Sequence, residues 1–215
     1  MTATSTRGRP RPLRGDRLLE VIAVALLGIA TVGSAWCGYQ ATRWNKEESE
    51  KAREAGRATI EGTRQFGLAT QTVSYDTNMV AQYAQAKAAG NEGLLRFYRE
   101  TLMRPEFVSV LDEWEAQIDD GEIPSNLLED QDYLDEQLQP YRDSQAAAEV
   151  ANVEAAEASE NTDGYVLTTL LLATALFFAG VTGSFRMRLL RIALLSTSAI
   201  VIAAAAARLT DLPTL

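Results

Sequence analysis

The chain of 215 residues contains no histidine and a single cysteine, Cys37. Histidine is the commonest general base and the commonest zinc ligand, so its absence excludes Ser-His-Asp and Cys-His catalytic arrangements and histidine-based zinc sites. One cysteine cannot form a disulfide within the chain. Because these absences remove most familiar routes to catalysis, we expect a protein that is not an enzyme and that carries no cofactor.

Charged residues are absent from three long segments, residues 21–42, 164–185 and 192–207. Each of the first two has 22 residues. A helix of that length extends about 33 Å, enough to cross a hydrocarbon core of about 30 Å. The third segment reaches this length when Leu189 and Leu190 are added and the flanking arginines extend to the interface. We therefore expect three transmembrane helices, at residues 18–42, 164–185 and 189–208.

The first apolar segment has an alternative interpretation as a cleaved signal peptide. Gly33-Ser34-Ala35 has the small-x-small pattern of a cleavage site. The apolar run continues beyond this point through Trp36 and Tyr39, which favours a membrane span.

The segment between the first two spans is strongly acidic. Residues 43–163 carry 26 acidic and 11 basic side chains, and residues 105–163 carry 18 acidic side chains against Arg142 alone. Such a surface repels phosphate backbones, so we expect no nucleic acid partner. Its richness in Ala, Glu, Lys, Arg and Gln favours helix. The sequence thus predicts an all-α fold, with three transmembrane helices plus a helical soluble domain inserted between the first and second spans. A basic disordered tail, residues 1–17, precedes the first span, and a short C-terminal tail, residues 209–215, follows the third.

Glycine and proline divide the acidic domain. Residues 90–93 predict a turn, and Pro105 predicts a new helix start after Arg104. Pro140 predicts a further break. The helix that follows the first span is expected to carry a weak apolar seam with alternating spacings of four and three residues: Phe66, Thr70, Val73, Thr77, Val80 and Ala84.

Arginine residues predict the orientation in the membrane. The connection between the second and third spans holds Arg186, Arg188 and Arg191, whereas residues 144–163 hold no lysine or arginine. This asymmetry places the connection in the cytoplasm and residues 43–163 outside it. The N-terminal tail, expected to be cytoplasmic, holds five further arginines: Arg7, Arg9, Arg11, Arg14 and Arg17. Aromatic residues are expected at the membrane interface: Trp36, Tyr39, Trp44 and Tyr165.

Small residues recur at four-residue intervals in the first two spans: Ala30, Ser34 and Gly38, then Ala175, Ala179 and Gly183. Small side chains let membrane helices approach closely. We expect the two sets to pack against each other within the chain. A subunit interface and chance spacing in alanine-rich helices are the alternatives.

Three clusters of carboxylates lie in the acidic domain: Asp112-Glu113-x-Glu115, Asp119-Asp120-x-Glu122, and Glu129-Asp130-x-Asp132-x-x-Asp135-Glu136. A solvated acidic face is the main interpretation, and binding of Ca²⁺ or Mg²⁺ is the alternative. Asp130 and Asp132 imitate the start of an EF-hand loop, but Leu134 occupies the next alternating position and the turn glycine is missing. We expect no metal site.

The end of the first span carries the pattern Trp36-x-x-Tyr39-Gln40-Ala41-x-x-Trp44, which resembles small uncharacterised bacterial inner-membrane proteins, a family of unknown function. The second span is similar to theirs in Gly164-Tyr165 and in Phe177-Phe178-Ala179-Gly180. The resemblance covers the spans and not the acidic domain. It implies location in the bacterial inner (plasma) membrane and no particular activity.

These patterns favour a membrane-anchored interaction or scaffold protein that acts through its helical extracytoplasmic domain. Its expected partners are the lipid bilayer and either another protein or a second copy of the chain. The alternative is a subunit of a homo-oligomeric channel or a transport accessory. No Asp, Glu, Lys or Arg lies inside the two long spans, where an ion pathway usually places one.

Overall fold

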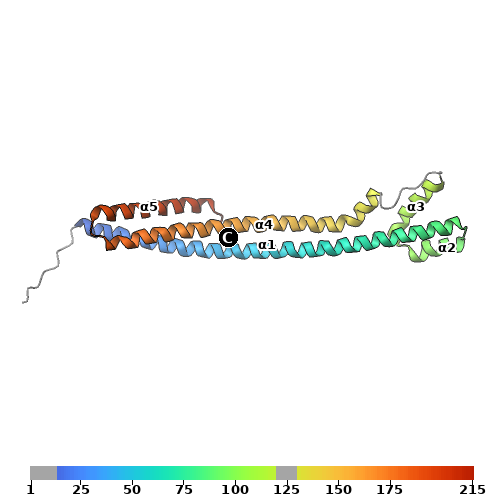
Figure 1. Cartoon of the computed structure of the whole chain (residues 1–215), viewed down its shortest axis with the longest axis horizontal. Helices are drawn as coiled ribbons and strands as arrows, with labels where there is room; N and C mark the ends of the chain where they lie inside the picture. Colours follow the sequence, from blue (N-terminus) through green and yellow to red (C-terminus); the bar gives the residue numbers. More distant parts are fainter. Residues whose placement is uncertain (1–13, 120–129) are drawn as a thin grey trace, which may run out of the picture. The chain divides into compact units, whose positions relative to one another are not determined.

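The computed structural model describes residues 14–119 and 130–215, and in these ranges every regular element is a helix (Figure 1). The elements are α1 (Arg14–Ala88), α2 (Glu92–Phe97), a π-helical segment (Tyr98–Leu102), α3 (Pro105–Asp119), α4 (Gln131–Val181), a 3-10 turn (Thr182–Ser184) and α5 (Arg188–Asp211). The chain forms two units, each with its own packing. Unit 1 comprises Met1–Lys51 with Val153–Leu215, and unit 2 comprises Ala52–Asn152. The prediction of an all-helical fold is confirmed.

Three helices, α1, α4 and α5, contain segments long and apolar enough to cross a membrane. Their large aliphatic side chains point outward: Val32 is 72% exposed, Leu170 60% and Ile200 69%. In water such exposure is unfavourable, but in a bilayer these side chains meet lipid tails. The chain is therefore consistent with a multi-pass membrane protein with three spans.

In unit 1, α1, α4 and α5 pack around a core of small and medium side chains. Ala30, Cys37, Tyr165, Ala175 and Ala205 are fully buried there. On α4 the buried positions repeat every seven residues, the spacing of helices that pack side by side: Ala158, Tyr165, Leu172 and Ala179. The third helix is tied in by a buried hydrogen bond in which the Ser198 hydroxyl donates to the Ala175 carbonyl at 2.9 Å.

One end of unit 1 is closed by the segment after α5. The carbonyl oxygen of Pro213 accepts hydrogen bonds from Trp44 Nε1 and from the Tyr165 hydroxyl, each at 3.0 Å. The Leu212 side chain lies so close to Gly164 that a Cβ there would be 2.6 Å from Leu212 Cδ2. A larger residue at position 164 would force the Leu212 side chain to move, and this segment joins all three helices at one level.

In unit 2, residues of α1 pair with the first third of α4. Buried positions of α1 again repeat every seven residues: Ala55, Gly62, Ala69, Asp76 and Tyr83. At Gly62 a Cβ would be only 3.2 Å from Gln145 Nε2 and 3.4 Å from Ser144 Cβ, so glycine permits a close approach. The rings of Phe66 and Tyr141 stack 5.3 Å apart beside it.

The far part of α1 in unit 2 is covered by α2 and α3. Gly90 makes the turn after α1 with φ of +66°, a left-handed conformation that favours glycine. The Asn91 side chain accepts a hydrogen bond from the Leu94 amide and caps α2. Pro105 begins α3, as predicted. These helices bury Met103 and Leu111 against Tyr83 of α1.

The predicted break at Pro140 is wrong, because α4 runs through it from Gln131 to Val181. Proline lacks the amide that would bond to the carbonyl of Glu136. Both residues are exposed, so water can satisfy this carbonyl without interrupting the helix.

The unit 1 core generates a stability prediction. Replacing Ala175 with leucine inserts three carbons where no surface is exposed and should destabilise the bundle by about 1–3 kcal/mol. Thermal unfolding in detergent measures the effect. The matched control is Val32→Leu, which enlarges an exposed aliphatic side chain and should leave the melting temperature within about one degree. Equal melting curves for Ala175→Leu and the parent would contradict this packing.

Candidate functional site

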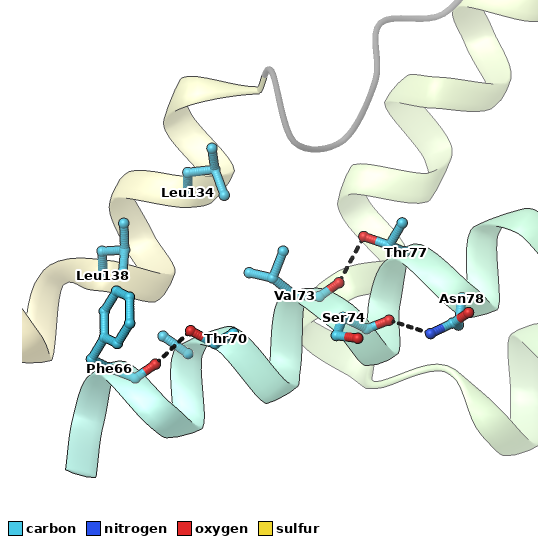
Figure 2. Close-up of a pocket in the computed structure, with 9 residues that line it drawn as sticks. Phe66, Thr70, Val73, Ser74, Thr77, Asn78, Leu134 and Leu138 are labelled. Atoms are coloured by element: carbon cyan, nitrogen blue, oxygen red, sulfur yellow. Dashed lines mark hydrogen bonds between the residues drawn. The ribbon is translucent and has the colours of Figure 1, made fainter. Parts of the chain in front are cut away.

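An open groove of about 410 Å³ lies between α1 and α4 in unit 2 (Figure 2). Leu134 and Leu138 of α4 face Phe66 and Val73 of α1 across it. The lining residues share the absence of charge: Phe66, Ala69, Thr70, Val73, Ser74, Thr77, Asn78, Leu134 and Leu138. Four members of the seam predicted from sequence, Phe66, Thr70, Val73 and Thr77, form its α1 wall.

The polar side chains of the groove bond to their own helix. Thr70 Oγ1 donates to the Phe66 carbonyl at 2.9 Å, and Thr77 Oγ1 donates to the Val73 carbonyl at 2.7 Å. Asn78 Nδ2 donates to the Ser74 carbonyl at 2.8 Å. Because these groups already have partners, the groove presents mainly methyl, methylene and aromatic surface. Phe66 at its edge is 51% exposed.

The α1 wall belongs to a segment almost without charge. Between Arg64 and Lys87, residues 65–86 contain one residue that is charged at neutral pH, Asp76, and its side chain is 1% exposed. Residues 43–64 of the same helix contain eleven charged side chains. Loss of charge from one stretch of an otherwise highly charged domain is typical of a contact surface. The sequence contains this signal, and a contact surface at residues 65–86 could have been expected from it.

The groove also differs from the packing of the same two helices in unit 1. There α5 contributes Ala205, Val201 and Ile202 to the core formed with α1 and α4, so three helices share one core. Among residues 14–119 and 130–215, those that line the groove in unit 2 belong to α1 and α4. It thus has the form of a helix pair without a third layer over this stretch.

A buried charge node holds the helices that form the groove. Asp76 of α1 accepts hydrogen bonds from the Arg104 guanidinium, Nη2 to Oδ2 at 2.5 Å and Nε to Oδ1 at 3.2 Å. The Tyr133 hydroxyl of α4 donates to Asp76 Oδ2 at 2.6 Å. The carboxylate therefore links α1, the start of α3 and the start of α4. Tyr133 precedes the groove residue Leu134, so the node sets the position of the α4 wall.

The surroundings of the node favour the protonated forms of Tyr133 and Arg104. Burial and the hydrogen bond to Asp76 both raise the pKa of Tyr133, so this hydroxyl keeps its proton. The hydrogen bond to Asp76 likewise raises the pKa of Arg104. The ring of Phe107 packs edge-on against Tyr133 with centroids 5.7 Å apart and limits water access. A buried carboxylate with three charge-assisted donors is well satisfied.

A second, more exposed ionic cluster joins α1 to the π-helical segment and α3. Glu115 accepts from Lys87 Nζ at 3.0 Å, from Arg99 Nη1 at 3.1 Å and from the Tyr83 hydroxyl at 2.9 Å. Burial alone would raise the pKa of Glu115, but the hydrogen bonds from Lys87 and Tyr83 outweigh it and lower that pKa. The stabilisation is therefore present at neutral pH and is lost as the pH falls through the carboxyl range.

The predicted helix-packing residues occupy different environments. Ala30, Ala175 and Ala179 are buried in unit 1, and Ser34 is half-buried. Gly38 and Gly183 are exposed, and a Cβ at either would meet nothing within 4 Å. The close approach to α4 is made by a neighbour of the predicted set, Gly33, where a Cβ would lie 3.0 Å from Leu172 Cδ1. A four-residue interval drifts around the helix, whereas the contact follows a heptad.

The predicted interface aromatics separate into two pairs. Trp36 and Tyr39 are about half exposed on the outside of α1. Trp44 is half-buried and Tyr165 fully buried, and both bond to the Pro213 carbonyl. The second pair thus helps to hold unit 1 together.

The arginines chosen for topology are only partly described. Arg7, Arg9 and Arg11 lie outside the described residues, and Arg14 begins α1. Arg17, Arg186 and Arg188 are exposed, and Arg191 is half-buried.

The carboxylates that imitate an EF-hand have a local structural role. The Asp130 side chain accepts a hydrogen bond from the Tyr133 amide at 3.0 Å and caps the first turn of α4. Asp132 is exposed in that first turn, where a negative charge is favourable. Within residues 14–119 and 130–215, no three His, Cys, Asp or Glu side chains gather in a way that could hold a metal ion.

The node generates a stability prediction. Replacing Arg104 with methionine leaves the Asp76 carboxylate buried without its cation and should destabilise the protein by about 3–5 kcal/mol at pH 7. Thermal unfolding at pH 7 measures the effect.

The matched control is Arg142→Met, which breaks an ion pair with Asp135 in which both side chains are about half exposed. Its effect should stay below about 1 kcal/mol. An Arg104→Met protein as stable as Arg142→Met at pH 7 would contradict the role assigned to the node.

The chain matches no family model, no curated protein and no solved structure. We therefore infer the function from the groove and from the node that positions it.

Proposed function

We propose that the protein is a membrane-anchored interaction protein that binds another helix through the groove in its soluble helical domain. The observation that carries the proposal is the open groove with nine lining residues and no charge among them. A groove of this kind suits an amphipathic helix, which inserts apolar side chains at intervals of three and four residues. Occupation would supply the third layer that α5 provides in unit 1.

The energetics support a contact rather than a solvated surface. Phe66, at the edge of the groove on this charge-free stretch of α1, is 51% exposed. Burial of apolar area stabilises by about 25 cal/mol per Å², so a helix that covers the groove gains from burying this ring, whose exposure to water is unfavourable. The node restrains the α4 wall before binding, and a preformed groove loses less entropy on association.

In this proposal the protein lies in a bacterial inner membrane, with its N-terminus in the cytoplasm and residues 43–163 outside. The exposed arginines Arg186, between α4 and α5, and Arg188, the first residue of α5, favour retention of that connection in the cytoplasm. The resemblance of the first two spans to small bacterial inner-membrane proteins supports the compartment. The three spans then serve as the anchor, and the acidic domain displays the groove.

The interaction is tested by cysteine labelling in native membranes. In a Cys37→Ser background, Thr70→Cys places a thiol in the groove, and Leu68→Cys places one on the exposed α1 surface that does not line it. A bound helix excludes water and reagent, so a polar maleimide should label Thr70→Cys more slowly than Leu68→Cys by on the order of tenfold. After purification and dilution in detergent the two rates should converge. Equal rates in membranes would contradict the proposal.

The orientation is tested by reporter fusions. Alkaline phosphatase is active only after export, so a fusion after Glu160 should be active and a fusion after Arg188 inactive. The reverse pattern would overturn the orientation and leave the three spans intact.

A further inference from the structure

We propose that the partner bound at the groove is a second copy of this chain. Two α1/α4 pairs would meet face to face and form a four-helix contact, with Phe66, Thr70, Val73, Leu134 and Leu138 of each copy inside. The inference rests on the proposed function, because it names the partner of the same groove.

Membrane anchoring restricts how two copies can meet. All copies share one orientation in the membrane, so the rotation that relates two of them must have its axis along the membrane normal. A two-fold contact then brings each surface against the same surface at the same depth. Any charge near the axis would face its own copy. A surface without charge near the axis therefore suits a self-contact of this kind.

The groove meets that requirement in a domain where charge is plentiful. Residues 105–163 hold 18 acidic side chains, and residues 43–64 hold eleven charged ones. By contrast, the nine described residues that line the groove include no acid and no base. The charge in the neighbouring stretch of α1, Asp76, is buried and paired with Arg104. A contact centred on the groove thus brings together the uncharged surface of two otherwise acidic domains.

The spacing along α1 fits a helical partner in the same register. Phe66, Thr70, Val73 and Thr77 follow one another at intervals of four, three and four residues, the pattern of an a/d seam. A second seam on the same helix already faces α4, through Ala69 and residues seven apart from it. With two adjacent seams, α1 has the surface that a helix in a four-helix bundle requires. Concentration of the chain in a membrane further favours self-contact.

The test is a cross-linking experiment on the full chain in its membrane. Two differently tagged copies are expressed together, each with Thr70 replaced by an aliphatic residue that carries a diazirine. Irradiation should produce an adduct of twice the mass of one chain that carries both tags. The control places the same residue at Leu68 and should give this adduct in far lower yield.

The other outcomes separate the two proposals. An adduct between Thr70 and a different protein, without the doubly tagged species, would overturn the second copy as occupant and leave the proposed function standing. Absence of any protein adduct at position 70 would overturn both.

A charge variant tests the symmetry argument independently. In Thr70→Lys, two ammonium groups would face each other across the axis, so the dissociation constant of the dimer in detergent should rise by on the order of tenfold or more. The variant Leu68→Lys adds the same charge away from the groove. If net charge alone controlled association, both variants would reduce the repulsion between the acidic domains, and both would associate more tightly. Unchanged or tighter association of Thr70→Lys, with an unaltered melting temperature, would overturn the proposal.

Discussion

The close approach of α1 and α4 through small side chains is the constraint on which both units depend. Alanine and glycine occupy the contact positions in each, from Ala30 and Gly33 in unit 1 to Gly62 and Ala69 in unit 2. Small side chains allow close backbones but bury little apolar area, so each helix pair needs further stabilisation. Unit 1 obtains it from α5. Unit 2 obtains it from α2, α3 and the Asp76 node, and these leave the groove uncovered.

This division explains why a buried carboxylate occurs in the middle of an apolar seam. A buried charge contributes little net stability compared with a well-packed apolar side chain, but it requires its partners in defined positions. Arg104, just before α3, and Tyr133, in the first turn of α4, meet this requirement. The Asp76 node thus fixes the relative positions of its residues. The alanine contacts only allow the two helix backbones to come close. This polar interaction thus restrains the α4 wall of the groove, although none of its three residues lines the groove.

Much of the fold was accessible from the sequence because its signals are local. Uncharged segments of 22 residues, the proline that begins α3 and the glycine in the turn after α1 each act within a few neighbouring residues. The node was not accessible, since Asp76 is separated from Arg104 by 28 residues and from Tyr133 by 57. A single aspartate in a helix is usually solvated, and only the tertiary contact reveals otherwise. Only one wall of the groove was accessible: the sequence shows the α1 seam, whereas Leu134 and Leu138 lie in a segment whose sequence is dominated by carboxylates. Pro140 was misjudged because its helix is open to water at that point.

The closure of unit 1 by Pro213 has a consequence for biosynthesis. Its carbonyl joins Trp44, 169 positions earlier in the chain, to Tyr165, 48 positions earlier. Neither bond can form until α5 and the segment after it have been synthesised. Until then Trp44 and Tyr165 lack this acceptor, and α1 and α4 have only their contacts with each other in this unit. Assembly of unit 1 thus ends with the segment around Pro213, which is synthesised after the residues of α1 and α4 that it contacts.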